Sequence, residues 1–186
     1  MHHLLLVGLG NPGDKYKFNR HNIGFIVLDE FAKMKNLSWK ESKKFAETSH
    51  SGEGYKLHIV KPLEYMNLSG KAVQNFCQSF KIPASQVLVV QDEIDLPFGK
   101  LKNKIGGGTA GHNGLKDIVE KIGSDFHRLR FGVGRPEKGG IEVIDFVLQN
   151  FNSEEKAALP SLVKESIGKI EDWISVSVTA LNQQKG

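Results

Sequence analysis

Residues 8–24 read "GLGNPGDKYKFNRHNIG" and follow the apolar run "HHLLLVGL" of residues 2–9. An apolar run bounded by glycine and proline predicts a buried strand that ends in a sharp turn. After the turn the chain presents His21 between Arg20 and Asn22. Two kinds of site follow a strand in this way: a nucleotide-binding loop, or a loop that holds a catalytic histidine beside amide side chains. The function of the chain depends on which of the two is present.

The nucleotide-binding alternative rests on "GLGNPG" at residues 8–13, which fits the pattern G-x-G-x-x-G. In a dinucleotide fold this loop runs directly into a helix whose backbone N–H groups face the pyrophosphate. Here Pro12 and a polar run separate the glycines from the first helical pattern, at 22–34. The acidic residue expected about 20 positions later would be Asp29 or Glu30, inside that helix rather than after a second strand. The sequence therefore disfavours a dinucleotide site.

Strand-like and helix-like segments alternate along the whole chain. Strands are predicted at 2–9, 44–50, 54–62, 86–95, 99–105 and 127–136, and helices at 22–34, 69–80, 115–123 and 153–181. Ser69 is a candidate helix cap, and Pro160 is expected to kink or break the last helix. The alternation predicts an α/β fold with a largely central sheet, in one domain over residues 1–186.

The bulk composition excludes several classes of protein. The 39% hydrophobic and 25% charged residues are ordinary for a soluble chain, and no apolar run approaches the roughly 18 residues that span a bilayer. The N-terminus lacks a signal-peptide pattern. Cys77 is the single cysteine, which fits a reducing cytoplasm, and its place in "AVQNFCQSF" predicts a small core residue rather than a nucleophile. We expect a cytoplasmic protein with no membrane segment.

Basic residues gather beside the glycine-rich segments. The net charge is +4 (25 minus 21) and the pI is about 9.1. Three groups stand out: Lys15, Lys17 and Arg20; Lys100, Lys102 and Lys104; and Arg128, Arg130 and Arg135. Each group can be a solvated face, but their position beside potential site loops also makes a polyanionic partner plausible.

Polar side chains follow several predicted strands, and ligands of open α/β sheets bind beyond the carboxyl ends of the strands. Asp92 closes the apolar strand in "VVQDEID"; it is either a solvated strand end or a carboxylate that orients an imidazole. The run "GGGTAGHNGL" is either a flexible loop or a loop whose backbone approaches a ligand. In "LEYMNLSGKAV", Tyr65, Met66 and Asn67 form a turn with an apolar anchor or a substrate contact.

Other chemistries have little support. The seven histidines show neither H-E-x-x-H nor ligand-like spacing, and no cysteines cluster, so we expect no metal site. The sequence also lacks the G-x-S-x-G elbow of serine hydrolases.

Five dispersed motifs occur together in one order: "GLGNPG…Y…RHN.G", "MNLSGKAV", "DE.DLP.G", "GG..GHNGLKDI" and "FHRLR.G.GRP". From residue 5 to about residue 150 this chain resembles bacterial peptidyl-tRNA hydrolase. The resemblance implies an enzyme that cleaves the ester between a peptide and the terminal ribose of tRNA, so its partner would be peptidyl-tRNA. It also implies a single α/β domain with a mixed twisted sheet flanked by helices, a monomer, and no cofactor.

The resemblance also implies roles for individual residues. His21 would be the catalytic base, Asp92 its orienting carboxylate, and Asn11 the residue that distinguishes N-blocked peptidyl-tRNA from free aminoacyl-tRNA. The residues implied in binding substrate or tRNA are Tyr16, Tyr65, Met66, Asn67, His112, Asn113, Lys104 and Arg130, the last two gripping the 5′ phosphate. Many relatives carry phenylalanine at the position of Tyr65, and often histidine and glycine before "GHN".

The residue chemistry suits ester hydrolysis. A histidine with a pKa of about 6.5 is a suitable general base near neutral pH, and asparagine N–H groups can stabilise an oxyanion. A non-catalytic RNA-binding relative of the same fold is the alternative. The presence of His21, Asp92 and all three asparagines favours the enzyme.

Overall fold

The computed structural model describes residues 1–184 and contains one seven-stranded sheet, in the order β2-β3-β4-β1-β5-β7-β6. Its strands are β1 (His2–Gly8), β2 (Lys40–Glu41), β3 (Phe45–Gly52), β4 (Tyr55–Pro62), β5 (Val87–Glu93), β6 (Leu101–Ile105) and β7 (His127–Gly132). The four central strands β4, β1, β5 and β7 run parallel, and the outer strands pair antiparallel. The predicted mixed α/β sheet is confirmed.

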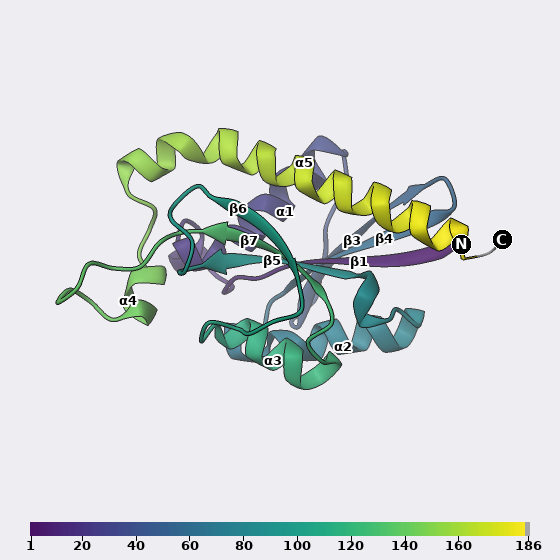
Figure 1. The fold of residues 1–186 in the computed structure, drawn as a ribbon, viewed down its shortest axis with the longest axis horizontal. Helices are drawn as coiled ribbons and strands as arrows, with labels where there is room; N and C mark the ends of the chain where they lie inside the picture. Colours follow the sequence, from purple (N-terminus) through teal and green to yellow (C-terminus); the bar gives the residue numbers. More distant parts are fainter. Residues whose placement is uncertain (185–186) are drawn as a thin grey trace.

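Helices cover both faces of the sheet, α1 and α5 on one side and α2 and α3 on the other (Figure 1). The α-helices are α1 (Ile23–Met34), α2 (Ser69–Phe80), α3 (Asn113–Ile122), α4 (Val143–Val147) and α5 (Ser153–Gln183). Four 3-10 helices connect them: η1 (Asp14–Tyr16), η2 (Arg20–Asn22), η3 (Met66–Leu68) and η4 (Ala84–Gln86). Within residues 1–184 no helix is both long and apolar enough to cross a membrane.

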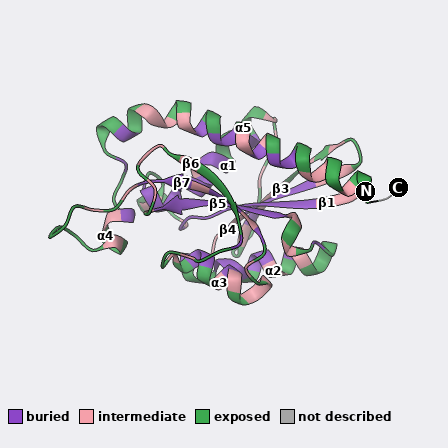
Figure 2. Cartoon of the chain, viewed as in Figure 1, coloured by how far each residue is buried: buried purple, intermediate pink, exposed green. Residues whose placement is uncertain are grey.

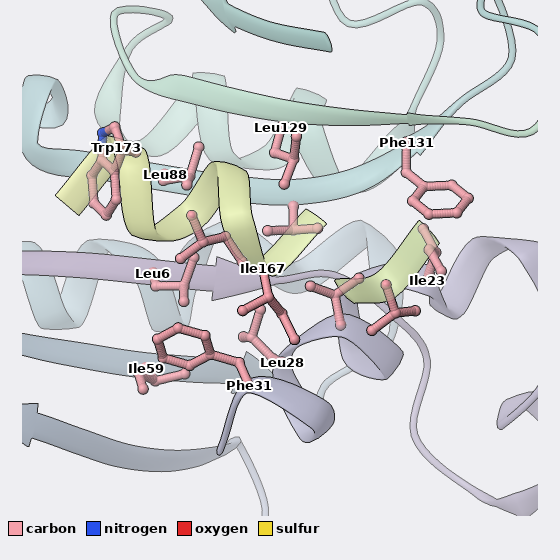
Figure 3. Packing of buried hydrophobic residues seen from close by; sticks show 14 of the residues in the cluster. Leu6, Ile23, Leu28, Phe31, Ile59, Leu88, Leu129, Phe131, Ile167 and Trp173 are labelled. Carbon is pink, nitrogen blue, oxygen red and sulfur yellow. The ribbon is translucent and has the colours of Figure 1, made fainter. Parts of the chain in front are cut away.

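The central strand β1 reads as a continuous apolar run because both of its faces are buried. Leu6 packs toward α1 and α5, where Figure 3 shows it with Phe31 and Ile167, whereas Leu5 belongs to the second core against α2 and α3. Figure 2 shows the central strands as buried. Along β6 every residue but the first is exposed, as expected for an edge strand. The two cores fix the sheet and therefore the loops at its ends.

A predicted helix cap at Ser69 and a predicted break of the last helix at Pro160 are wrong. Ser69 does not cap α2, because η3 leads directly into that helix and the Ser69 hydroxyl instead donates to the Met66 carbonyl at 2.7 Å. Pro160 does not break α5, which is continuous from Ser153 to Gln183. Proline has no N–H, so the helix carbonyl four residues before Pro160 lacks its usual donor; because Pro160 is exposed, that carbonyl can bind water. Val163 and Ile167 hold the helix against the core. Helix α4 was not predicted.

Cys77 is partly buried in α2, beside the second core, and burial raises the pKa of its thiol to about 11. A thiol that stays protonated near neutral pH is a poor nucleophile. This agrees with the interpretation of Cys77 as a small packing residue.

Candidate active site

The glycines of the first motif allow backbone segments to pack closely around the end of β1. A Cβ on Gly24 would collide with the Leu9 nitrogen and the Val90 oxygen, and a Cβ on Gly10 would lie within 2.9 Å of the Phe25 ring. Protein atoms thus occupy the space that a dinucleotide fold leaves for pyrophosphate beside these glycines. The structure, like the sequence, therefore disfavours a nucleotide-binding loop. The close approach at Gly24 also allows the start of α1 to pack against β1 and β5.

Asn11 and Asn22 lock the turn after β1. The Asn11 backbone N–H donates to Asn22 Oδ1 and the Asn22 side chain donates back to the Asn11 carbonyl, both at 2.9 Å. The Asn11 side-chain oxygen accepts from the Met66 backbone N–H at 2.8 Å. Among residues 1–184 nothing accepts from Asn11 Nδ2. This nitrogen is the donor that remains for a ligand.

His21 lies in η2, at the amino end of α1, and meets Asp92 at the carboxyl end of β5. Its Nδ1 is 3.0 Å from both carboxylate oxygens, and both side chains are buried. A carboxylate accepts, so Nδ1 carries the hydrogen and Nε2 keeps its lone pair. The interpretation of Asp92 as a solvated strand end is therefore wrong, and the imidazole has the tautomer that a general base needs.

The pair shifts the pKa of both groups. Burial would lower the pKa of the His21 imidazole, but the charge and hydrogen bond of Asp92 outweigh burial and raise it above the usual value. Burial would raise the pKa of the Asp92 carboxyl, but the imidazoles of His21 and His112 outweigh burial and hold it well below its usual range. Asp92 thus remains ionised when His21 titrates.

His112 approaches Asp92 from the other side. Its Nε2 is 2.9 Å from Asp92 Oδ1, and its Nδ1 accepts from the backbone N–H groups of Gly114 and Leu115 at 3.1 and 3.3 Å, which caps α3. Ligand atoms of His21, Asp92 and His112 lie within 4.8 Å of one another, a spacing that could hold a metal ion. With the Nδ1 lone pair in the cap, Nε2 carries the hydrogen and has no lone pair for a metal. The donor chemistry of His112 therefore disfavours a metal at this cluster.

A cavity of about 520 Å³ opens beside these groups. His21, Asp92, His112 and Asn113 line one part of it, and side chains of α4, including Ile144, line another. Asn113 is exposed at the first position of α3. The cavity therefore combines a buried base, an amide and an apolar wall.

The other predicted substrate contacts lie elsewhere around the turn. Met66 is buried, and its sulfur would lie 2.6 Å from a Cβ on Gly114, so it packs η3 against the start of α3. Asn67 and Tyr65 are exposed on and before η3, and Tyr16 is half-buried at the end of η1. Within residues 1–184, none of these four residues lines the cavity of His21.

Lys104 and Arg130 lie on the neighbouring strands β6 and β7. Lys104 is opposite Arg128, and Arg130 is opposite Lys102, so the four side chains share one face of the sheet. Lys104 is exposed, whereas Arg130 is partly buried at 3.7 Å from Glu93. Both predicted phosphate contacts are thus on the α3 side of the sheet edge.

Two arginines counted among the basic groups are structural. Arg128 is buried and donates to the carbonyls of Gly107 and Ser124, which ties the glycine-rich loop to β7. Arg20 is buried and donates to Glu155 at 2.8 Å. The prediction of a basic surface at these positions is wrong, because protein acceptors already neutralise or bind both guanidinium groups.

The Arg20–Glu155 pair is a feature that sequence reasoning missed. Arg20 also donates to the Phe146 carbonyl at 3.0 Å and stacks on the Phe146 ring at 4.0 Å, so it connects η2 with α4 and α5. Glu155 forms a capping box with Asn152, a local pattern that the sequence displays. Its pairing with Arg20 spans 135 positions and has no local signal.

A mixed α/β sheet whose parallel central strands carry a buried histidine–aspartate pair at their carboxyl end is suited to a hydrolase that uses a general base. Comparison with known proteins narrows this class. The family model described as peptidyl-tRNA hydrolase matches residues 5–185, and the chain belongs to the peptidyl-tRNA hydrolase family. The resemblance seen in the motifs is thereby confirmed.

Individual relatives agree over most of the chain. Peptidyl-tRNA hydrolase of Rickettsia bellii (strain RML369-C) is 46% identical over 173 residues, which cover 91% of this chain and 90% of the relative. That of Syntrophomonas wolfei is 44% identical over 178 residues, or 95% and 96% of the two chains. The crystal structure of peptidyl-tRNA hydrolase from Acinetobacter baumannii matches with a TM-score of 0.87 and 35% identity, and covers 95% of this chain and 91% of that one.

Proposed function

We propose that this chain hydrolyses the ester between the peptide and the terminal ribose of peptidyl-tRNA, with His21 as the general base, and so recycles tRNA during translation. Family membership supports the reaction. The single observation that carries the role of His21 is its Nδ1 hydrogen bond to both Asp92 oxygens at 3.0 Å, at the wall of a cavity.

The reaction begins when His21 Nε2 takes a proton from water as the water oxygen attacks the ester carbonyl. The resulting imidazolium is stabilised by Asp92, which stays ionised. When the tetrahedral intermediate collapses, the bond to the ribose oxygen breaks and His21 returns the proton to that oxygen. Positioned proton transfer of this kind typically contributes about 10²–10⁴-fold to the rate.

Asparagine amides supply the neutral contacts of the proposed site. Asn113 lies on the cavity wall and can donate to the oxyanion that develops on the ester carbonyl, an interaction worth about 2.7–4 kcal/mol for a well-placed donor. Asn11, held by Met66, can donate Nδ2 to the peptide carbonyl of the substrate. Asn67 is assigned to the substrate near the ester, and Tyr16 and Tyr65 to flanking contacts, because they match family motifs.

Replacing His21 with alanine tests the role of the base. We expect turnover of N-acetyl-aminoacyl-tRNA to fall by about 10²-fold or more while tRNA binding persists. His50→Ala, on β3, is the matched control and should retain activity. Near-normal turnover by His21→Ala would remove His21 from the mechanism. Wild-type protein that binds RNA without turnover would favour the non-catalytic alternative.

We further propose that the enzyme acts in the cytoplasm as a monomer, without a cofactor. Light scattering of purified protein should then give a mass near 20.6 kDa. A mass twice as large would contradict the monomer.

A further inference from the structure

We propose that His112 is a positioning residue for the hydrolysis and not a substrate contact: the amino end of α3 locks its ring in one neutral tautomer, which gives Asp92 a permanent second hydrogen bond. The inference rests on the proposed role of His21 as base. It concerns the group that adjusts the basicity of His21 through Asp92.

The tautomer follows from which groups can donate. Gly114 and Leu115 present backbone N–H groups to His112 Nδ1, and such groups only donate, so Nδ1 must keep its lone pair. The ring hydrogen is then on Nε2, which points at Asp92 Oδ1 from 2.9 Å. Protonating Nδ1 would direct its hydrogen at two other hydrogens and leave two backbone donors without an acceptor. The cap therefore favours the tautomer with the hydrogen on Nε2 and the lone pair on Nδ1.

The hydrogen bond from His112 reduces the stabilisation that Asp92 gives to the protonated ring of His21. Asp92 Oδ1 accepts from both rings, whereas Oδ2 accepts from His21 alone. The bond from His112 stabilises part of the carboxylate charge, so less of that charge is directed at the His21 imidazolium. The two ring centroids are 4.7 Å apart.

The other charged groups around the cavity are already paired. Glu93 lies 3.7 Å from Arg130, and Arg135 lies 2.6 Å from Asp95. Arg20, next to His21 in the chain, is bound to Glu155 at 2.8 Å. His112 is thus the group whose contact with Asp92 can be removed without leaving a charge unpaired.

His112→Asn separates the hydrogen bond to Asp92 from the two hydrogen bonds that cap α3. Asparagine is among the best helix caps, so its side-chain oxygen can accept from the amino end of α3, but the side chain is too short to reach Asp92 as well. His112→Ala removes the hydrogen bond to Asp92 and the cap of α3. Comparing the two variants distinguishes the effect on Asp92 from the effect on the helix.

For His112→Asn we expect the kinetic pKa of the acid limb of kcat/KM to rise by about half a unit or more. A rise of half a unit means about threefold less activity well below that pKa. KM should change little, and Tm should stay near that of the wild type. His112→Ala should show the same rise and, in addition, a lower Tm from the lost cap. A raised KM with an unchanged kinetic pKa would show that His112 contacts substrate and would overturn the proposal.

Nitrogen NMR of the free protein gives a readout independent of activity. The His112 side chain should show the Nε2–H tautomer, with the hydrogen on Nε2 and the lone pair on Nδ1. An Nδ1–H tautomer would contradict the lock. If the wild type failed to hydrolyse peptidyl-tRNA, the proposed function would fail while this measurement still decided the tautomer.

Discussion

Asn11 presents its side-chain amide in one orientation because a backbone donor fixes the oxygen. The Met66 N–H occupies Oδ1 at 2.8 Å, so Nδ2 must point the other way. This resolves the usual ambiguity of an amide, in which oxygen and nitrogen can exchange places. A selectivity that depends on donating a hydrogen bond therefore has a structural basis in the contact between η3 and the turn after β1.

Asn11→Asp should narrow the preference for N-acetyl-aminoacyl-tRNA over aminoacyl-tRNA. A carboxylate can still accept from Met66, so the turn should persist, but it cannot donate to a peptide carbonyl and it attracts a free ammonium. The ratio of kcat/KM for the two substrates measures the effect. An unchanged ratio would place the selectivity in other residues.

Asp92→Asn should lower the kinetic pKa of His21, which is the opposite of the change expected for His112→Asn. Asp92 raises the pKa of the imidazole, so removing its charge moves the acid limb of the pH–rate profile toward lower pH. The maximal rate should also fall, because the asparagine does not stabilise the imidazolium. A kinetic pKa that stayed constant or rose would argue against direct pairing of His21 with Asp92.

At the scale of elements, β4 and α2 enclose a histidine that folding holds in its neutral form. His58 is 3% exposed, its ring stacks on Phe80 at 4.0 Å, and its Nε2 lies 2.9 Å from His3 Nδ1. Burial lowers its pKa to about 4, and the positive charges of His3 and Lys56 contribute. His3 and His58 therefore contribute to packing, and neither lines the cavity of His21 within residues 1–184.

The stability of the fold should therefore fall as the pH falls from about 6.5 toward 4. The unfolded chain binds a proton at His58 in that range and the folded chain does not, so the contribution is complete above the unfolded pKa. Between pH 7 and pH 5 the loss should be about 2 kcal/mol. Urea unfolding of wild type and His58→Phe at both pH values measures it, because titrations away from His58 and its partner His3 are common to both proteins. Equal losses in the two proteins would contradict the assignment.

At the scale of the whole molecule, the order of the strands in the sheet is harder to predict from sequence than the strands and helices themselves. The longer strands carry their own period and boundary signals, so β1 and the hairpin of β3 with β4 were predicted from local residues, whereas the two-residue strand β2 was not predicted. The carboxyl-edge rule is consistent with the contacts of His21 and His112 with Asp92 at the end of β5, whereas Asn11 does not line their cavity within residues 1–184. Arg20 and Arg128 looked like surface charge because their partners, Glu155 and the carbonyls of the glycine-rich loop, lie far from them or in the backbone.

The tautomer of His112 was out of reach for the same reason. Its sequence neighbourhood shows a histidine after glycines, which is consistent with a substrate contact. Only the start of α3 and the position of Asp92 together show which nitrogen carries the hydrogen. A role that depends on contacts with two elements far apart in the sequence, such as that of His112, can be recognised only in the folded structure.

The edge of the sheet at β6 and β7 is where a tRNA phosphate contact would act on the whole molecule. Lys104 is exposed there and Arg130 lies across the strand pair, on the same face. Replacing both with alanine should raise KM for full-length tRNA. The slope of log KM against log salt concentration should also become smaller, by about one for each lost phosphate contact.

Lys40→Ala is the matched control, because Lys40 is an exposed lysine on β2, at the opposite edge of the sheet. It should leave both KM and the salt dependence near wild type. Cleavage of a short substrate without the 5′ phosphate should be almost unchanged in the double variant, since the lost contacts add affinity for phosphate and not chemistry. Arg130 lies 3.7 Å from Glu93, which lines the cavity of His21, so this substrate also detects any effect transmitted through Glu93. If the double variant slowed the short substrate as much as full-length tRNA, Lys104 and Arg130 would act on the catalytic centre and the phosphate assignment would be wrong.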